Sequence, residues 1–159
     1  MQYRIVGLDP EQFTPLFRVS DTELARRGVR RMLVTEKPGF PCRVTLEDAE
    51  PGETVLLLNY EHQPVRSPYR SSHAIFVREG ADERRNAVGS LPGALRSREL
   101  SLRSYDADGM MLDADLAQGD AIEPLIARLF EDPNASYIHA HNAKRGCFAA
   151  RIERVEEQP

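Results

Sequence analysis

The sequence predicts an α+β fold, a largely antiparallel sheet with two or three helices packed on it, in one domain spanning residues 1–159. The length of 159 residues and the hydrophobic content of 41% suit one globular unit, because domains commonly contain about 100 to 200 residues. Several short runs have the apolar spacing of strands, whereas few segments carry helix-capping signals. The chain contains neither an internal repeat nor a break in composition, so its elements are expected to share one core.

The N-terminal region combines one strand with two helix starts. Tyr3 to Val6 has the composition of a short strand. Asp9 resembles a helix N-cap, and Pro10 follows it at the first helical position, which proline favours. Ser20 opens a second capping box, and Gly28 is suited to end the helix that follows it. The region therefore predicts two short helices after the first strand.

Four strands are expected next. Residues 31–35 and 42–46 have strand composition and are separated by a cluster rich in proline and glycine. Thr54 to Tyr60 and His73 to Val77 are apolar at both alternating positions. Because such strands are covered on both faces, we expect these two at the centre of the sheet.

A hairpin and a longer helix follow. Leu100 to Tyr105 and Met110 to Ala114 flank a turn with the sequence Asp-Ala-Asp-Gly, which favours a β-hairpin. Apolar residues then recur at helical spacing from Ile122 to Phe130. We expect Asp120 to cap this helix and Pro133 to end it.

The last two expected strands, 136–141 and 147–155, carry most of the distinctive polar residues. If Asn142 to Gly146 is the connecting loop, His139 lies opposite Ala149 and both histidines of the first strand share one face, with the second histidine opposite the cysteine that begins the partner strand. The apolar positions of the second strand are expected to face the core: Phe148, Ala150 and Ile152.

Composition restricts the partners and the compartment. The formal net charge is -4, and the 21 basic residues, 19 of them arginine, are dispersed along the chain. Binding to nucleic acid requires a concentrated basic face, so we expect no nucleic-acid partner. No apolar run has the roughly 18 residues needed to span a bilayer, and none resembles a secretory signal. We therefore expect a cytoplasmic protein with no membrane partner and with two reduced cysteines.

The segment 61–72 is a candidate anion site. It is long for a loop between two buried strands, and such loops are commonly functional. Arg70, two serine hydroxyls and successive backbone N–H groups form a chemically sensible receptor for a carboxylate or phosphate. Residues expected to contact the anion, here or near the cysteines, are Arg70, Ser71, Ser72, Tyr69, His62, Arg43 and Arg145.

The candidate catalytic residues are His139, His141, His73 and Cys147. A histidine can exchange protons near neutral pH, and a cysteine near a histidine can act as a nucleophile. An alternative is a zinc site formed by His139, His141 and Cys147, because imidazole and thiolate groups are ligands that zinc prefers. No CxxC or HExxH spacing accompanies these three residues.

Five segments together resemble a known family. They are Gly39–Leu46, Pro51–Glu53, Leu58–His62, Pro68–His73 and His139–Phe148. Over nearly its whole length the chain resembles the bacterial family called domain of unknown function 1203 (DUF1203), and the last segment is the most specific. The resemblance implies a small bacterial single-domain protein. It implies no particular activity, cofactor or catalytic residue.

The residues thus support three hypotheses. The first is a protein that binds or transforms an anionic small molecule, with arginines pairing the anion and histidines exchanging protons. The second is a non-catalytic binding or interaction module that uses the same arginines for a partner's carboxylates. The third is the zinc site.

Overall fold

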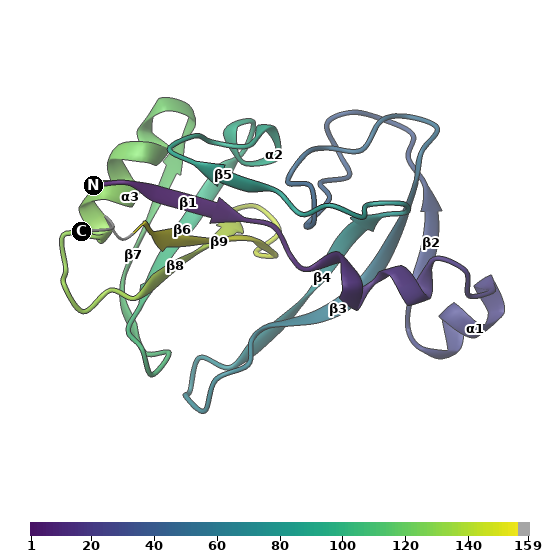
Figure 1. Ribbon diagram of the computed structural model, residues 1–159, viewed down its shortest axis with the longest axis horizontal. Coiled ribbons are helices and arrows are strands. Elements are labelled where there is room, and N and C mark those ends of the chain that lie inside the picture. Colours follow the sequence, from purple (N-terminus) through teal and green to yellow (C-terminus); the bar gives the residue numbers. More distant parts are fainter. Residues whose placement is uncertain (156–159) are drawn as a thin grey trace.

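A computed structural model describes residues 1–155 and confirms the α+β class (Figure 1). The described chain forms two antiparallel sheets. The six-stranded sheet has the order β5-β1-β9-β8-β6-β7, and the three-stranded sheet has the order β2-β3-β4. The strands are β1 (Tyr3–Val6), β2 (Arg30–Leu33), β3 (Thr54–Gln63), β4 (Ser71–Arg78), β5 (Asn86–Val88), β6 (Glu99–Tyr105), β7 (Met111–Gln118), β8 (Tyr137–Asn142) and β9 (Phe148–Arg154). The helices are α1 (Asp21–Arg26), α2 (Gly93–Arg96) and α3 (Ile122–Leu129).

The six-stranded sheet contains the predicted hairpins β6–β7 and β8–β9. Its apolar face packs against α3, whose buried side chains include Ile122 and Ile126. Asp120 is not the cap of this helix. A 3-10 turn over Gly119–Ala121 leads the chain directly into the helix, so the N-cap position falls on Ala121. Ala121 makes no side-chain hydrogen bond to the helix.

The N-terminal segment follows the predicted caps but forms less helix than predicted. Asp9 caps only a 3-10 turn, Pro10–Gln12, by accepting a hydrogen bond from the backbone N–H of Glu11. Pro15 lies in a second 3-10 turn, and its missing N–H is consistent with the absence of a continuous α-helix there. Ser20 caps α1 as expected, and Gly28 follows that helix with a φ of 73°.

The three-stranded sheet differs from the prediction in three ways. Its strands β3 and β4 are longer than expected, so the predicted long segment 61–72 is strand at both ends and the loop covers only residues 64–70. Only β3 is central, while β4 lies at the sheet edge. Residues 42–46 form turns rather than a strand, because Leu46 adopts a φ of 56° and its N–H bonds back to the carbonyl of Cys42.

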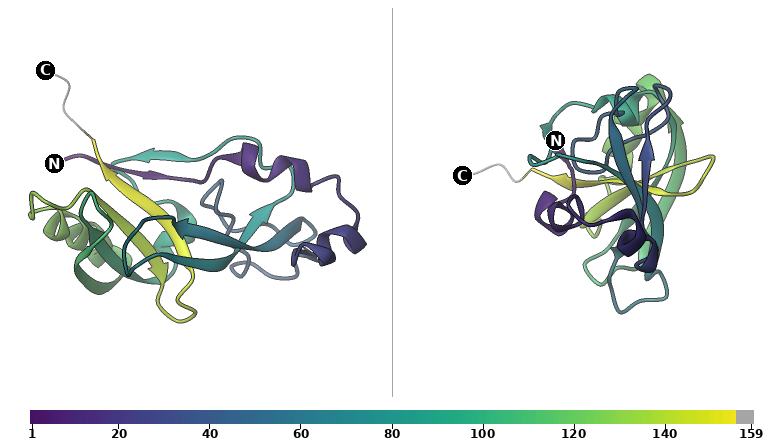
Figure 2. Two further views of the ribbon diagram at one scale, coloured as in Figure 1. Left: turned by 90° about the horizontal axis from the view of Figure 1, so that it is seen from below. Right: turned by 90° about the vertical axis from the view of Figure 1, so that its right-hand side faces the viewer.

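The two sheets contact each other through the β3–β4 hairpin. The Ser67 hydroxyl donates a hydrogen bond to the Gly109 carbonyl at 2.9 Å, joining the tips of the β3–β4 and β6–β7 hairpins. Figure 2 shows an elongated molecule with α3 near one end and α1 near the other. The β3–β4 hairpin covers the face of β8 on which His139 and His141 lie. Among the described residues, no helix is both long and apolar enough to cross a membrane.

Candidate functional site

All four histidines of the chain converge where the two sheets meet. His62 lies on β3 and His73 on β4, whereas His139 and His141 lie on β8. The ring centroid of His62 is 4.9 Å from that of His73, 5.6 Å from that of His139 and 5.1 Å from that of His141. These contacts join residues from both sheets, so the cluster exists only in the packed structure.

The register of β8 and β9 explains why an aromatic ring joins this cluster. The pairing is His139 with Arg151, and not with Ala149 as predicted. A β-bulge shifts the register between the two strands, so that His141 pairs with Phe148 rather than with Cys147. Phe148 consequently stacks on the imidazole of His62, with 4.9 Å between centroids and 8° between ring planes. Phe148 is buried as predicted, but it packs against the histidines rather than in the core cluster that contains Ala150 and Ile152.

Burial makes these histidines poor bases. His139 is 1% exposed and His141 is fully buried. Burial is the main cause that lowers the pKa of His62 to about 3, of His139 to about 2 and of His141 to about 4. The positive charge of Arg103 contributes to all three shifts, and burial also lowers the pKa of His73. All four imidazoles are thus neutral near pH 7.

In two of the histidines, His141 and His62, one ring nitrogen takes part in hydrogen bonds. The Nδ1–H of His141 donates to the Gly146 carbonyl at 2.9 Å, which leaves Nε2 as the unprotonated nitrogen. Nε2 of His62 lies 2.8 Å from Nδ1 of His73 and 3.2 Å from the Ser71 hydroxyl. Within residues 1–155, three buried ring nitrogens have no hydrogen-bond partner: Nδ1 of His62, Nδ1 of His139 and Nε2 of His141. A buried polar atom left unpaired costs about 1–3 kcal/mol, so their concentration at one place is notable.

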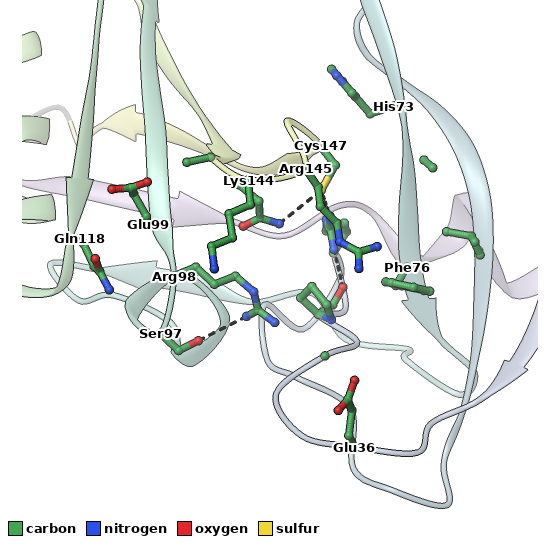
Figure 3. Close-up of a pocket in the computed structure, with 17 residues that line it drawn as sticks. Glu36, His73, Phe76, Ser97, Arg98, Glu99, Gln118, Lys144, Arg145 and Cys147 are labelled. Carbon is green, nitrogen blue, oxygen red and sulfur yellow. Dashed lines mark hydrogen bonds between the residues drawn. The ribbon is translucent and has the colours of Figure 1, made fainter.

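A cavity of about 910 Å³ opens beside the histidine cluster, between the sheets (Figure 3). We call it the inter-sheet cavity. It is lined by Glu36, Gly39, Pro41, Arg43, Leu57, His73, Ala74, Phe76, Ser97, Arg98, Glu99, Gln118, Asn142, Ala143, Lys144, Arg145 and Cys147. Four of these side chains are basic and two are acidic. Figure 3 shows Lys144 and Arg145 extending toward the cavity from the β8–β9 loop, and Arg98 extending toward it from near Ser97. Basic side chains therefore outnumber acidic ones in this lining.

Arg43 is the most buried charge of this lining, at 3% exposure. Its guanidinium donates to the carbonyls of Phe148 and Pro41 at 2.7 and 2.6 Å and to Sγ of Cys147 at 3.3 Å. Arg43 forms no ion pair with a carboxylate in the described part of the chain. Burial lowers its pKa, yet a guanidinium remains protonated at neutral pH. Two carbonyls and the Cys147 sulfur hold this side chain in place, and no carboxylate of the described chain pairs with its charge.

The residues predicted to form one site fall into three places. Arg43, Arg145, His73 and Cys147 line the inter-sheet cavity. The other three histidines lie in the cluster and do not line it. Tyr69, Arg70 and Ser72 are exposed and lie outside the cavity, and the Ser71 hydroxyl contacts the cluster through His62.

Arg70 already has a partner. Its guanidinium forms an ion pair with Glu61 at 3.1 Å, and both side chains are largely exposed. The extension of β3 and β4 beyond their predicted ends brings these two residues together across the hairpin. An arginine paired in this way is less available to an anion than the buried Arg43.

The predicted zinc set is also changed by the structure. One ring nitrogen from each of His62, His139 and His141 lies within 4.8 Å of the other two, and Cys147 is not in this group. The sulfur of Cys147 instead accepts hydrogen bonds from Arg43 and from the Asn142 amide, at 3.3 and 3.4 Å. The third candidate ligand is thus His62, from the other sheet.

Two residues of the site were not singled out by the sequence. Arg98 follows the short helix α2 and enters the cavity while bonded to Asp48 at 2.6 and 2.8 Å. Phe148 reaches the histidines only because of the bulge. Neither a four-residue helix nor a bulge has a strong sequence signal, whereas the unusual concentration of histidines near both hairpins was visible.

A family model described as "Protein of unknown function (DUF1203)" matches residues 39–154 of this chain. The chain belongs to the DUF1203 family. The match confirms the resemblance noted in the sequence. No curated protein and no solved structure matches the chain. The DUF1203 segment contains all four histidines and every residue that lines the cavity except Glu36, whereas β1, α1 and β2 precede it.

Proposed function

We propose that this DUF1203 protein binds a small anionic molecule in the inter-sheet cavity. The observation that carries the proposal is the buried guanidinium of Arg43, which donates to two carbonyls and a sulfur but has no carboxylate partner among residues 1–155. Removing a charge from water is costly unless an opposite charge compensates it. An anion beside Arg43 would supply that compensation.

The rim of the cavity supports the same ligand class. Lys144 and Arg145 lie in the exposed β8–β9 loop, line the cavity, and form no ion pair in the described chain. Arg98 differs from them, because Asp48 neutralises its charge. The free cationic groups therefore come from Arg43 at the wall and from this loop at the rim. Arginine and lysine are the usual receptors of carboxylates and phosphates.

The remaining lining indicates the character of the ligand. Leu57, Ala74, Phe76 and Pro41 contribute apolar surface. The volume lies within the range of about 300–1,000 Å³ that is typical of small-molecule sites. We infer a ligand that combines an acidic group with an apolar portion. Only His73 and Cys147, among the candidate catalytic residues, line the cavity and could touch such a molecule.

Binding of two probes, inorganic phosphate and benzoate, tests the proposal by NMR titration of the full chain. The variant Lys144→Gln/Arg145→Gln removes two rim charges from an exposed loop. The control Arg66→Gln/Arg84→Gln changes the net charge equally at exposed positions outside the cavity. We expect at least one probe to bind, with shifts at cavity residues, and the rim variant to weaken binding about tenfold or more. Equal weakening in both variants, or no binding of either probe, would overturn the proposal.

A further inference from the structure

We propose that His62, His139 and His141 form a binding site for a borderline transition-metal ion of the Zn²⁺ type, separate from the inter-sheet cavity. One ring nitrogen of each residue lies within 4.8 Å of the other two, and all three side chains are buried. Two ligands come from β8 of the six-stranded sheet and one from β3 of the three-stranded sheet. We call these residues the histidine triad.

The unpartnered nitrogens are the first argument for a ligand. Among residues 1–155, only four buried side-chain nitrogen or oxygen atoms lack a hydrogen-bond partner, and three of them belong to the triad. Buried polar atoms are almost always paired in proteins, so a concentration of exceptions requires an explanation. A metal ion bound through these three nitrogens would account for all of them together. Neutral imidazole, which burial favours here, is the form of histidine that binds metals.

The outer nitrogens are the second argument. Metal-binding histidines commonly use their second ring nitrogen to contact a carbonyl, a carboxylate or water, which fixes the ring and its tautomer. His141 does this with the Gly146 carbonyl, so its unpartnered Nε2 is the free lone pair. His62 uses Nε2 to contact Nδ1 of His73, so its unpartnered nitrogen is Nδ1. In both residues, the nitrogen available to a metal is the one without a protein partner.

The donor set indicates the metal class. Three imidazoles suit zinc and the later first-row metals, whereas Mg²⁺ and Ca²⁺ prefer oxygen ligands. The triad contains no carboxylate, which excludes it as a site built for those harder ions. His73 contacts His62 but is not in the triad, and it also lines the cavity. The metal proposal rests on the histidines themselves and does not require that the cavity bind an anion.

Zinc binding to metal-stripped, full-length protein tests the inference by calorimetry, with Co²⁺ as a spectroscopic substitute. We expect one Zn²⁺ per chain and a visible Co²⁺ spectrum of low coordination number. His62→Gln and His139→Gln should each lower the zinc affinity by more than about 100-fold, beyond the roughly 10- to 100-fold contributed by outer partners such as His73. His73→Gln should fall within that smaller range. Cys147→Ser should leave the zinc affinity unchanged, because Cys147 lies outside the triad.

A second measurement does not depend on how the variants fold. In the ¹H–¹⁵N spectrum of the wild-type imidazoles, Zn²⁺ should shift one ring nitrogen in each of three histidines and leave the nitrogens of His73 without a direct metal shift. Absence of zinc and cobalt binding would overturn the inference. So would a Cys147→Ser variant that loses as much affinity as His139→Gln, or a wild-type spectrum in which zinc shifts fewer than three histidines.

Discussion

The ring of Phe148 lies parallel to the imidazole of His62, with 4.9 Å between their centroids and 8° between their planes. The two residues come from different sheets, β9 and β3. Phe148 also contacts His139 and His141 edge-on, so one aromatic side chain contacts the whole histidine triad. The contact connects the packing of the two sheets with the arrangement of the proposed metal ligands.

Replacing Phe148 with alanine should destabilise the protein strongly. The side chain is 2% exposed, and truncating a buried phenylalanine commonly costs about 3–5 kcal/mol because a cavity remains. Urea unfolding followed by circular dichroism would measure the free energy of unfolding. Leu112→Ala is the matched control, since Leu112 is 38% exposed and should cost much less. A small effect of Phe148→Ala would mean that the sheets do not depend on this ring for their packing.

The Asp48–Arg98 ion pair should make stability depend on pH. Burial opposes ionisation of Asp48, but the hydrogen bonds and charge of Arg98 outweigh it and lower the pKa of the carboxyl. A carboxylate with a lowered folded pKa stabilises the protein above its unfolded pKa of about 4, and this contribution is lost as the pH falls through the folded value. The free energy of unfolding, measured from pH 7 to pH 3, should therefore decrease toward acid partly because of Asp48.

Asp48→Asn isolates this contribution. Removing one partner of a largely buried pair costs about 3 kcal/mol or more at pH 7, and the difference from wild type should shrink toward pH 3. Asp113→Asn breaks an exposed pair with Arg128 and should cost at most about 1 kcal/mol. A constant difference between Asp48→Asn and wild type across this pH range would contradict the assignment.

Tyr137 and Gln63 should show a non-additive effect. The Tyr137 hydroxyl is 2.8 Å from Nε2 and 3.1 Å from Oε1 of the Gln63 amide, and both residues are buried. Tyr137→Phe leaves a buried amide unpaired and should cost about 1–3 kcal/mol. Adding Gln63→Leu removes the unpaired amide, so the double variant should be less destabilised than the sum of the single variants. Simple additivity in denaturant unfolding would indicate that the amide finds other partners.

Gly7 should not tolerate a side chain. A Cβ at this position would lie 2.0 Å from the backbone carbonyl oxygen of Val44, which no side-chain rotation can relieve. Gly7→Ala should therefore destabilise the protein by about 1–3 kcal/mol or more, as overpacking does, and should lower the midpoint of thermal unfolding accordingly. Gly80→Ala is a useful comparison, because Gly80 has a φ of 79° but open space around it, so its cost is only the backbone term of about 1–2 kcal/mol. Equal midpoints for Gly7→Ala and wild type would disprove the steric argument.

Local signals in the sequence predicted much of the fold. The cap at Ser20, the β6–β7 hairpin and the spacing of α3 all depend on residues close together in the chain, and the structure contains each of them. The division into two sheets was not predicted. Apolar residues at both positions of β3 indicate that both faces are covered, but they do not indicate which strands cover them.

Only part of the candidate site could be predicted from the sequence, for the same reason. Period-two alternation placed His139 and His141 on one face, but a one-residue bulge in β9 redirected Phe148 and changed the register. The partnership of His62 with these residues depends on how one sheet packs on the other, which no short-range pattern encodes. The buried charge of Arg43 likewise results from tertiary packing.

The distribution of the histidines has a mechanical consequence. His62 and His73 belong to one sheet, His139 and His141 to the other, and both cysteines are free, so no disulfide ties the sheets within the described chain. A metal ion held by the triad would cross-link segments that are far apart in the sequence, and because the triad exists only in the folded protein, the free energy of metal binding would add to the free energy of unfolding. Metal occupancy would then resist separation of the sheets, while leaving the hydrogen bonding within each sheet as it is.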